Sequence, residues 1–170
     1  SVDKLTSQQK KDRLVVEKAF AAKDIKEEKV KLVDQLNTER ALIIDPFSKE
    51  KQKLTEELDA LKKGLKDTEN TLNEEAAKLA TTTNKFIERG VPPDTLNTLL
   101  SEDLKAIQGR MDAEIAKTNP TMQEKINTLV ALESTAKQKV EEVEKKFNIL
   151  LEENRTAYPK KVAELTKLCQ

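Results

Sequence analysis

The chain contains no histidine, a single cysteine and three separated glycines. Without histidine it lacks the commonest general base and metal ligand of proteins. Cys169 alone cannot build a zinc site, a Cys–His pair or a disulfide framework. Three scattered glycines do not make the glycine-rich loop that holds phosphate groups. We therefore expect no catalytic, cofactor-binding or metal-binding residues, no enzyme activity and no small-molecule substrate.

Aromatic residues and long apolar runs are also scarce. Four phenylalanines, one tyrosine and no tryptophan are too few for a thick globular core, and no apolar run approaches the ~20 residues that cross a bilayer. No basic-then-apolar leader follows Ser1. We expect a cytoplasmic protein, with secretion after processing left open, and either a processed chain or a piece of a larger one. The triplet Asn154-Arg155-Thr156 matches a glycosylation sequon, but it falls in a helical pattern.

Neither charge sign is in excess. The 31 basic residues balance 31 acidic ones and are interleaved with them, whereas a nucleic-acid-binding protein usually gathers basic residues on one face with aromatics that stack on bases. The balance also leaves no basic face for an anionic membrane. We expect no nucleic-acid partner. A helical lipid-binding or membrane-surface protein is kept as the alternative to the function given below.

The residues that are abundant favour helices. Ala, Glu, Lys, Leu and Arg make up 88 of the 170 residues, a composition typical of long helices and coiled coils. Apolar residues recur at intervals of three, four and seven, the spacing of a coiled-coil seam. The clearest run of such positions in the first half is Leu54, Leu58, Leu61, Leu65, Thr68, Leu72, Leu79 and Phe86. The first quarter shows a broader stripe, which consists of Val15, Ala22, Ile25, Leu32, Leu36 and Ile43 and is flanked by Val16, Ala19 and Val33. In the second half the positions at this spacing are Leu100, Leu104, Ile107, Met111, Ile115, Met122, Ile126, Leu129, Ala136, Val140, Val143, Phe147 and Leu150.

One short segment interrupts the pattern and predicts a reversal of the chain. Gly90 suits the left-handed residue that ends a helix, Pro92 and Pro93 cannot continue one, and Asp94 suits the N-cap of the next. The sequence therefore predicts one elongated helical domain over residues 1–170, with a first arm at 3–89, a turn at 90–94 and a second arm at 95–168.

Folding the chain at this turn places residue i opposite roughly residue 183 − i, which brings apolar residues together along the whole length. The expected pairs are Leu79 with Leu104, Leu72 with Met111, Leu61 with Met122, Leu54 with Leu129, Phe47 with Ala136, Ile43 with Val140, Leu36 with Phe147, Ile25 with Tyr158 and Val15 with Leu168. Thr68, Glu75 and the polar run Thr81–Thr83 predict looser packing toward the turn than around Leu54–Leu65.

Pro46 and Pro120 allow two interpretations. Either proline can kink a continuous helix or begin a new one. A four-helix arrangement would give a third helix at 94–118 of only ~37 Å, against ~60–70 Å for the others, and would leave the ends of its neighbours uncovered. We therefore predict an all-α fold, a long antiparallel coiled-coil helical hairpin kinked near Pro46 and Pro120. An elongated three- or four-helix bundle is the alternative.

The function expected from this fold is structural: a scaffold, spacer or docking arm that binds a protein partner or associates with itself. The candidate partner-binding residues are those of the turn, Glu88, Arg89, Val91, Pro92, Pro93 and Asp94, because exposed apolar residues on a helical reversal are a natural contact. The same residues also suit a turn that has no partner. A second candidate is self-association through Ile43, Ile44 and Phe47, if these side chains face outward.

Overall fold

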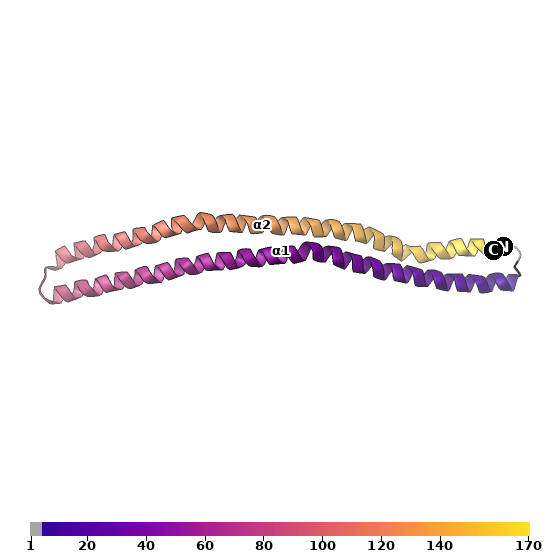
Figure 1. Ribbon diagram of the computed structural model, residues 1–170, viewed down its shortest axis with the longest axis horizontal. Helices are drawn as coiled ribbons and strands as arrows, with labels where there is room; N and C mark the ends of the chain where they lie inside the picture. Colours follow the sequence, from indigo (N-terminus) through magenta and orange to yellow (C-terminus); the bar gives the residue numbers. More distant parts are fainter. Residues whose placement is uncertain (1–4) are drawn as a thin grey trace. The chain divides into compact units, whose positions relative to one another are not determined.

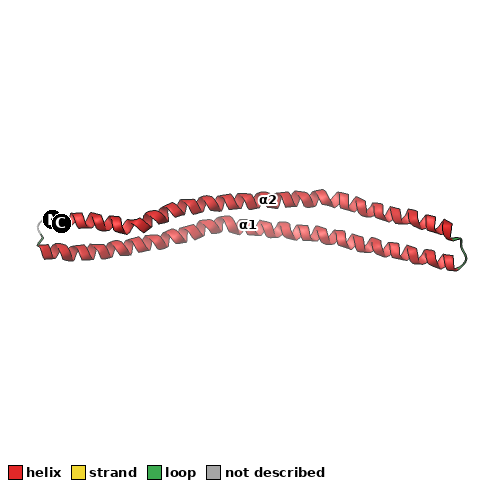
Figure 2. Ribbon diagram, turned by 180° about the vertical axis from the view of Figure 1, so that it is seen from behind, coloured by secondary structure: helices red, strands yellow, loops and turns green. Residues whose placement is uncertain are grey.

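The computed structural model describes residues 5–170, and over this range the chain forms two helices and no strand. Helix α1 spans Ser7–Glu88 and helix α2 spans Pro93–Leu168. Figure 2 shows helix along nearly all of the described chain. The helices pack against each other in opposite directions (Figure 1), so the predicted all-α helical hairpin is confirmed. Residues 3 and 4, the predicted start of the first arm, lie outside the described residues.

The hairpin consists of two units, each built from one part of α1 and one part of α2. Unit 1 joins Ser1–Phe47, of which residues 5–47 are described, to Glu133–Gln170. Unit 2 comprises Ser48–Leu132 and contains the turn.

Three prolines lie within the helices without ending them. Pro46 is inside α1, and helical residues continue on both sides of Pro120 and Pro159 in α2. Each proline removes one main-chain hydrogen bond of its helix and disturbs its path. The helices therefore pass through these residues, and the three- or four-helix bundle does not form.

The core of unit 1 is a small apolar cluster between the two helices. Leu32 and Leu36 from α1 pack with Phe147 from α2, and Val143 and Leu150 border this cluster. Phe147 is only 2% exposed. The predicted pairing of Leu36 with Phe147 is confirmed.

The core of unit 2 is concentrated away from the turn. Its buried residues are Leu54, Leu58 and Leu72, and no described residue between Leu72 and the turn is buried. Glu75 and the threonines of the Thr81–Thr83 run do not provide the apolar surface that burial requires. The looser packing predicted near the turn is confirmed by this pattern.

At the start of α1 the predicted seam is one residue out of position. Val15 is 68% exposed and Ala22 is exposed, whereas Leu14 is half-buried and Ala21 is buried. Leu168 is also exposed, so its predicted pairing with Val15 is wrong. At this end of α2, Leu165 and Cys169 are buried instead.

The same shift occurs where α1 approaches the turn. Phe86 was expected in the seam but is 44% exposed, while Ile87 is half-buried. A strict step of seven residues drifts by ~20° per heptad around a straight helix, so the inward positions after Leu79 follow steps of four, at Thr83 and Ile87. On α2, three residues expected in the seam remain more than a third exposed: Leu104, Ile126 and Tyr158.

Ion pairs between the helices confirm the register in unit 2. Lys125 Nζ donates to Glu57 Oε2 at 2.7 Å, and Arg110 Nη1 donates to Glu75 Oε2 at 2.6 Å. In each pair the two residue numbers add up to within about two of 183, as the predicted fold-back requires. Glu75 interrupts the apolar pattern of α1, but its carboxylate forms an ion pair with Arg110 of α2.

Unit 1 shows the same register. Arg40 Nη2 donates to Glu144 Oε1 at 2.7 Å, and Lys146 Nζ donates to Glu39 Oε1 at 3.2 Å. The Lys146 ammonium also lies 5.2 Å from the centroid of the Phe147 ring, a distance at which a cation is attracted to an aromatic face. Charged side chains thus border the core of the unit on both helices.

We expect Phe147→Ala to lower the free energy of unfolding by about 3–5 kcal/mol, because it removes the most buried side chain of unit 1 and leaves a cavity. Phe86→Ala is the matched control, since Phe86 is 44% exposed and its loss should cost less, about 1–2 kcal/mol. Urea titrations followed by circular dichroism measure both. Equal losses in the two variants would contradict the described core.

The Glu57–Lys125 pair predicts a pH dependence. The hydrogen bond from Lys125 lowers the pKa of Glu57 below its ordinary value of 4.5, although partial burial opposes this shift. A carboxylate with a lowered pKa in the folded state stabilises the fold above its unfolded pKa, and this stabilisation is lost as the pH falls through the folded value. We expect Glu57→Gln to reduce the urea midpoint at pH 7 but to match the native chain at about pH 3.

The control for this prediction is Glu74→Gln, which changes an exposed carboxylate of the same helix and should leave the urea midpoint almost unchanged at both pH values. A loss in the Glu57→Gln variant that persists unchanged at low pH would show that the ion pair is not its cause.

Candidate protein-interaction surface at the turn

The turn is held by main-chain hydrogen bonds that end α1. The Val91 N–H donates to the Phe86 carbonyl at 3.1 Å, and the Gly90 N–H donates to the Ile87 carbonyl at 3.0 Å. These two bonds form a Schellman motif, which needs a left-handed residue just after the helix. Gly90 provides it with φ = 93°. The predicted role of Gly90 is confirmed, and the backbone of the turn is fixed by its own bonds.

Helix α2 begins earlier than the sequence suggested. Pro93 is its first residue, and Asp94 lies in its first turn, so the predicted N-cap role of Asp94 is wrong. Proline suits the first helical position because its fixed φ matches the helix and its missing N–H would have no partner there. The Asp94 carboxylate still lies near the positive end of the helix dipole, where a negative charge is favourable.

The structure brings the six predicted residues together because they are nearly consecutive. Five of them are exposed, namely Glu88, Arg89, Pro92, Pro93 and Asp94, and Val91 is half-buried. Two further exposed apolar side chains near the turn were not predicted: Phe86, in the last turn of α1, and Leu99, in the second turn of α2, which is 52% exposed. Phe86 was missed because its seven-residue step from Leu79 placed it in the seam.

The segment around the turn is also poor in charge. Among residues 81–101 only four are charged, whereas 36% of the whole chain is charged. They are Lys85, Glu88, Arg89 and Asp94. Cores of protein interfaces are depleted in charged residues, because each buried charge must be removed from water. This end of unit 2 therefore has a composition that suits burial against another protein.

The second candidate surface has only one outward apolar residue. Ile44 is 41% exposed, but Ile43 and Phe47 are half-buried on the seam side of α1. The condition set for self-association through all three side chains is therefore not met.

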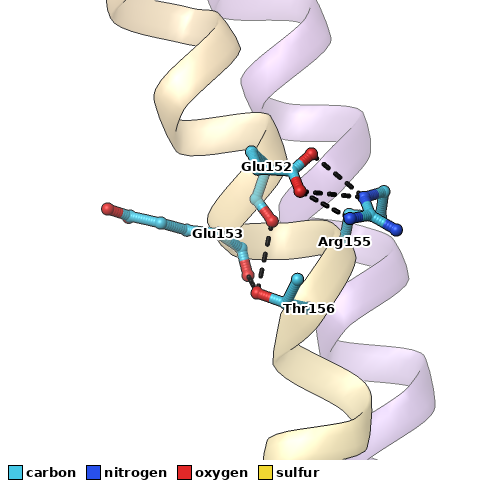
Figure 3. Close-up of polar contacts among 4 residues, drawn as sticks. All are labelled: Glu152, Glu153, Arg155 and Thr156. Atoms are coloured by element: carbon cyan, nitrogen blue, oxygen red, sulfur yellow. Dashed lines mark hydrogen bonds and ion pairs between the residues drawn. The ribbon is translucent and has the colours of Figure 1, made fainter.

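The sequon in unit 1 is part of the contact between its helices. Asn154 Nδ2 donates to the Ile25 carbonyl of α1 at 3.0 Å. Beside it, Arg155 binds Glu152 through two guanidinium nitrogens, and the Thr156 hydroxyl donates to main-chain carbonyls of the preceding turn, including that of Glu153 (Figure 3). The hydrogen bond from Arg155 lowers the pKa of Glu152. Because both side chains of this ion pair are mostly exposed, it contributes little to stability.

Two features are absent from the described part of the chain, residues 5–170. This range holds no group of three or more side chains arranged to bind a metal ion, and none of its helices is long and apolar enough to cross a membrane. Hollows in the surface of unit 1 are grooves between α1 and α2, one of them lined by Val30, Thr38 and Phe147. Comparisons with protein-family models, curated proteins and solved structures find no significant match to this chain.

The turn geometry predicts opposite effects for two glycine substitutions. Gly90→Ala should destabilise the fold by about 1–2 kcal/mol, because a Cβ is unfavourable at a positive φ. Gly64→Ala should stabilise it by about 0.5–1 kcal/mol, because Gly64 lies within α1 and no other atom lies within 4 Å of an added Cβ. Thermal unfolding of both variants measures this, and a stabilising Gly90→Ala would contradict the left-handed cap.

Proposed function

We propose that this chain is a non-enzymatic structural and interaction module, a coiled-coil hairpin that acts as a spacer or docking arm and contacts a protein partner with its turn. The observation that supports this most directly is the exposed turn segment held by the Schellman motif at Gly90. A surface that is already ordered loses little conformational entropy on binding, so more of its contact energy appears as affinity.

The side chains at this surface suit such a contact. Phe86 and Leu99 supply exposed apolar area, and two consecutive prolines add rigid apolar surface without rotatable side chains. Arg89 is exposed beside them, and arginine is among the residues that most often dominate the energy of protein interfaces. A partner with an apolar pocket and an acidic group beside it matches this arrangement.

The alternative function, a lipid-binding or membrane-surface helical protein, has weaker support. The balanced charge of the chain gives little attraction to an anionic bilayer, which draws clusters of basic residues. Co-sedimentation with vesicles containing phosphatidylserine distinguishes the two functions. Binding that is strong at low salt and lost at high salt would favour the membrane alternative.

We expect the double variant Arg89→Ala/Val91→Ala to bind the partner at least tenfold more weakly than the native chain, because it removes the central cation and an apolar side chain of the surface. A photo-crosslinking residue at position 92 identifies the partner, and titration calorimetry with the purified partner measures the change. The control is Ile149→Ala, which alters a residue that is 62% exposed in unit 1. Equal affinity of all three chains would refute contact through the turn.

A further inference from the structure

Exposed apolar side chains are distributed very unevenly along α1. Seven large apolar residues of its first part are exposed, whereas none between residues 45 and 85 is. The seven are Val15, Val16, Phe20, Val30, Val33, Leu42 and Ile44. Residues 45–85 show that the outer surface of this helix can lack large exposed apolar side chains. A cluster of such side chains in the first part is the kind of surface that another molecule covers.

Most of this apolar surface forms a second stripe, distinct from the seam that faces α2. Seven exposed residues follow one another along α1 with only two polar positions among them, Lys26 and Asn37. They are Val15, Ala19, Ala22, Val30, Val33, Ala41 and Ile44. Every step along this line is three or four residues, so the line stays on one side of the helix, about 120° from Leu32. The stripe is ~44 Å long. Its spacing of three and four residues is the spacing at which a second helix packs along the first.

The two edges of this second stripe differ in charge. Lys18, Lys29 and Arg40 lie along one edge, and the other edge carries Glu27, Asp34 and Asp45 together with Lys23. In a parallel pair of helices, a residue on one edge faces the residue five positions later on the opposite edge of the partner. Lys29 then faces Asp34 of the other helix and Arg40 faces Asp45. These two attractive pairs outnumber the one repulsive pair, Lys18 with Lys23. In an antiparallel pair, edges of the same sign would meet.

We propose that the second stripe binds a second copy of this chain, with the two α1 helices parallel and in register. Both charge pairs then form twice, once on each side of the two-fold axis. Arg40 already donates to Glu144, but a guanidinium group has five N–H donors and can serve both carboxylates. The self-association surface is thus the second stripe, which includes Ile44 but neither Ile43 nor Phe47.

The polar residues of the stripe fit this arrangement. Asn37 meets Asn37 of the other copy, and a single asparagine at a core position of a parallel coiled coil fixes the register at some cost in stability. Lys26 also lies on the line, where its long aliphatic stem can cover apolar surface while the ammonium group reaches water. These two residues oppose any sliding of one helix along the other.

The exposed surface of the chain is large enough for such an interface. It amounts to 12,581 Å², whereas a compact monomer of the same 19.2-kDa mass exposes about 8,400 Å². A stable protein interface needs about 800 Å² from each partner. Covering the second stripe in a dimer would therefore bury only a part of the area by which this chain exceeds a compact monomer.

The first test is the mass of the chain in solution, measured by sedimentation equilibrium between about 1 and 100 µM. We expect twice the 19.2-kDa chain mass at the upper end. Val30→Lys/Val33→Lys should raise the dissociation constant at least a hundredfold, because it places two charges in the centre of the stripe. The control is Leu42→Lys, since Leu42 is 70% exposed but lies about 200° around the helix from Ile44. Its mass should match that of the native chain.

The second test fixes the orientation. In a Cys169→Ala background, Asn37→Cys and Ala22→Cys should each form a disulfide between two copies on mild oxidation. A parallel, in-register pair brings each of these positions beside its own copy, whereas an antiparallel pair can do so at only one place along the stripe. Cys169→Ala alone is the control and should form none. Lys29→Glu should weaken the dimer, and Lys29→Glu/Asp34→Lys should restore it. None of these variants changes the turn, so the result is independent of binding there.

A monomer at every concentration would overturn the proposal, whatever other protein binds the stripe. So would a dimer that Val30→Lys/Val33→Lys leaves intact, or one in which Asn37→Cys or Ala22→Cys forms no disulfide.

Discussion

The packing of one apolar stripe of α1 against one of α2 supports the tertiary structure of both units. Among the described residues only nine are buried, and all are apolar or, in the case of Cys169, weakly polar. Two helices cannot surround a core, so each inward side chain has neighbours on one side and solvent near the other. Stability then depends on keeping the two stripes in register. Successive residues lie about 100° apart around a helix, so a shift of one residue rotates the apolar stripe away from its partner. Ion pairs between the helices penalise such slips, since each joins charges that only one alignment brings together.

Much of this architecture could be predicted from the sequence, because the controlling signals are local or periodic. Gly90 and the prolines after it mark the reversal by their backbone chemistry, and the alternation of three and four gives helix and register together. The prediction was wrong where small angular errors accumulate. Phe86 lies outside the seam because steps of seven drift around the helix, and Val15 is exposed for the same reason. The start of the second helix was predicted two residues too late, at 95 with Asp94 as its N-cap, because Pro93 is the better first helical residue.

The turn residues were predicted because they are contiguous, and contiguity brings them together in any fold. The exposure of Phe86 and Leu99 could be recognised only in the structure. On a helix, the side on which a residue lies decides whether it is exposed or packs against the other helix. The second stripe of α1 was visible in the sequence only as a broadening of the apolar pattern. Its meaning depends on the comparison with the rest of α1, where a polar outer surface shows that a helix of this chain needs no additional apolar residues to pair with α2. The roles proposed for both surfaces are contacts between proteins, and neither role requires the chemistry of histidine, which the chain lacks.

The hairpin connectivity has a consequence for how the chain folds. Contacts between the helices join residues that are 35 positions apart near the turn, as in Arg110 with Glu75, and 160 apart at the open end, where Lys10 reaches Gln170. The entropy lost in closing a loop rises with its length, so pairing is least costly beside Gly90 and most costly at the termini. Helical proteins usually fold fast because their contacts are local. This chain has helical segments but long-range tertiary contacts, which favours a zipper-like order of assembly in which the ends join last.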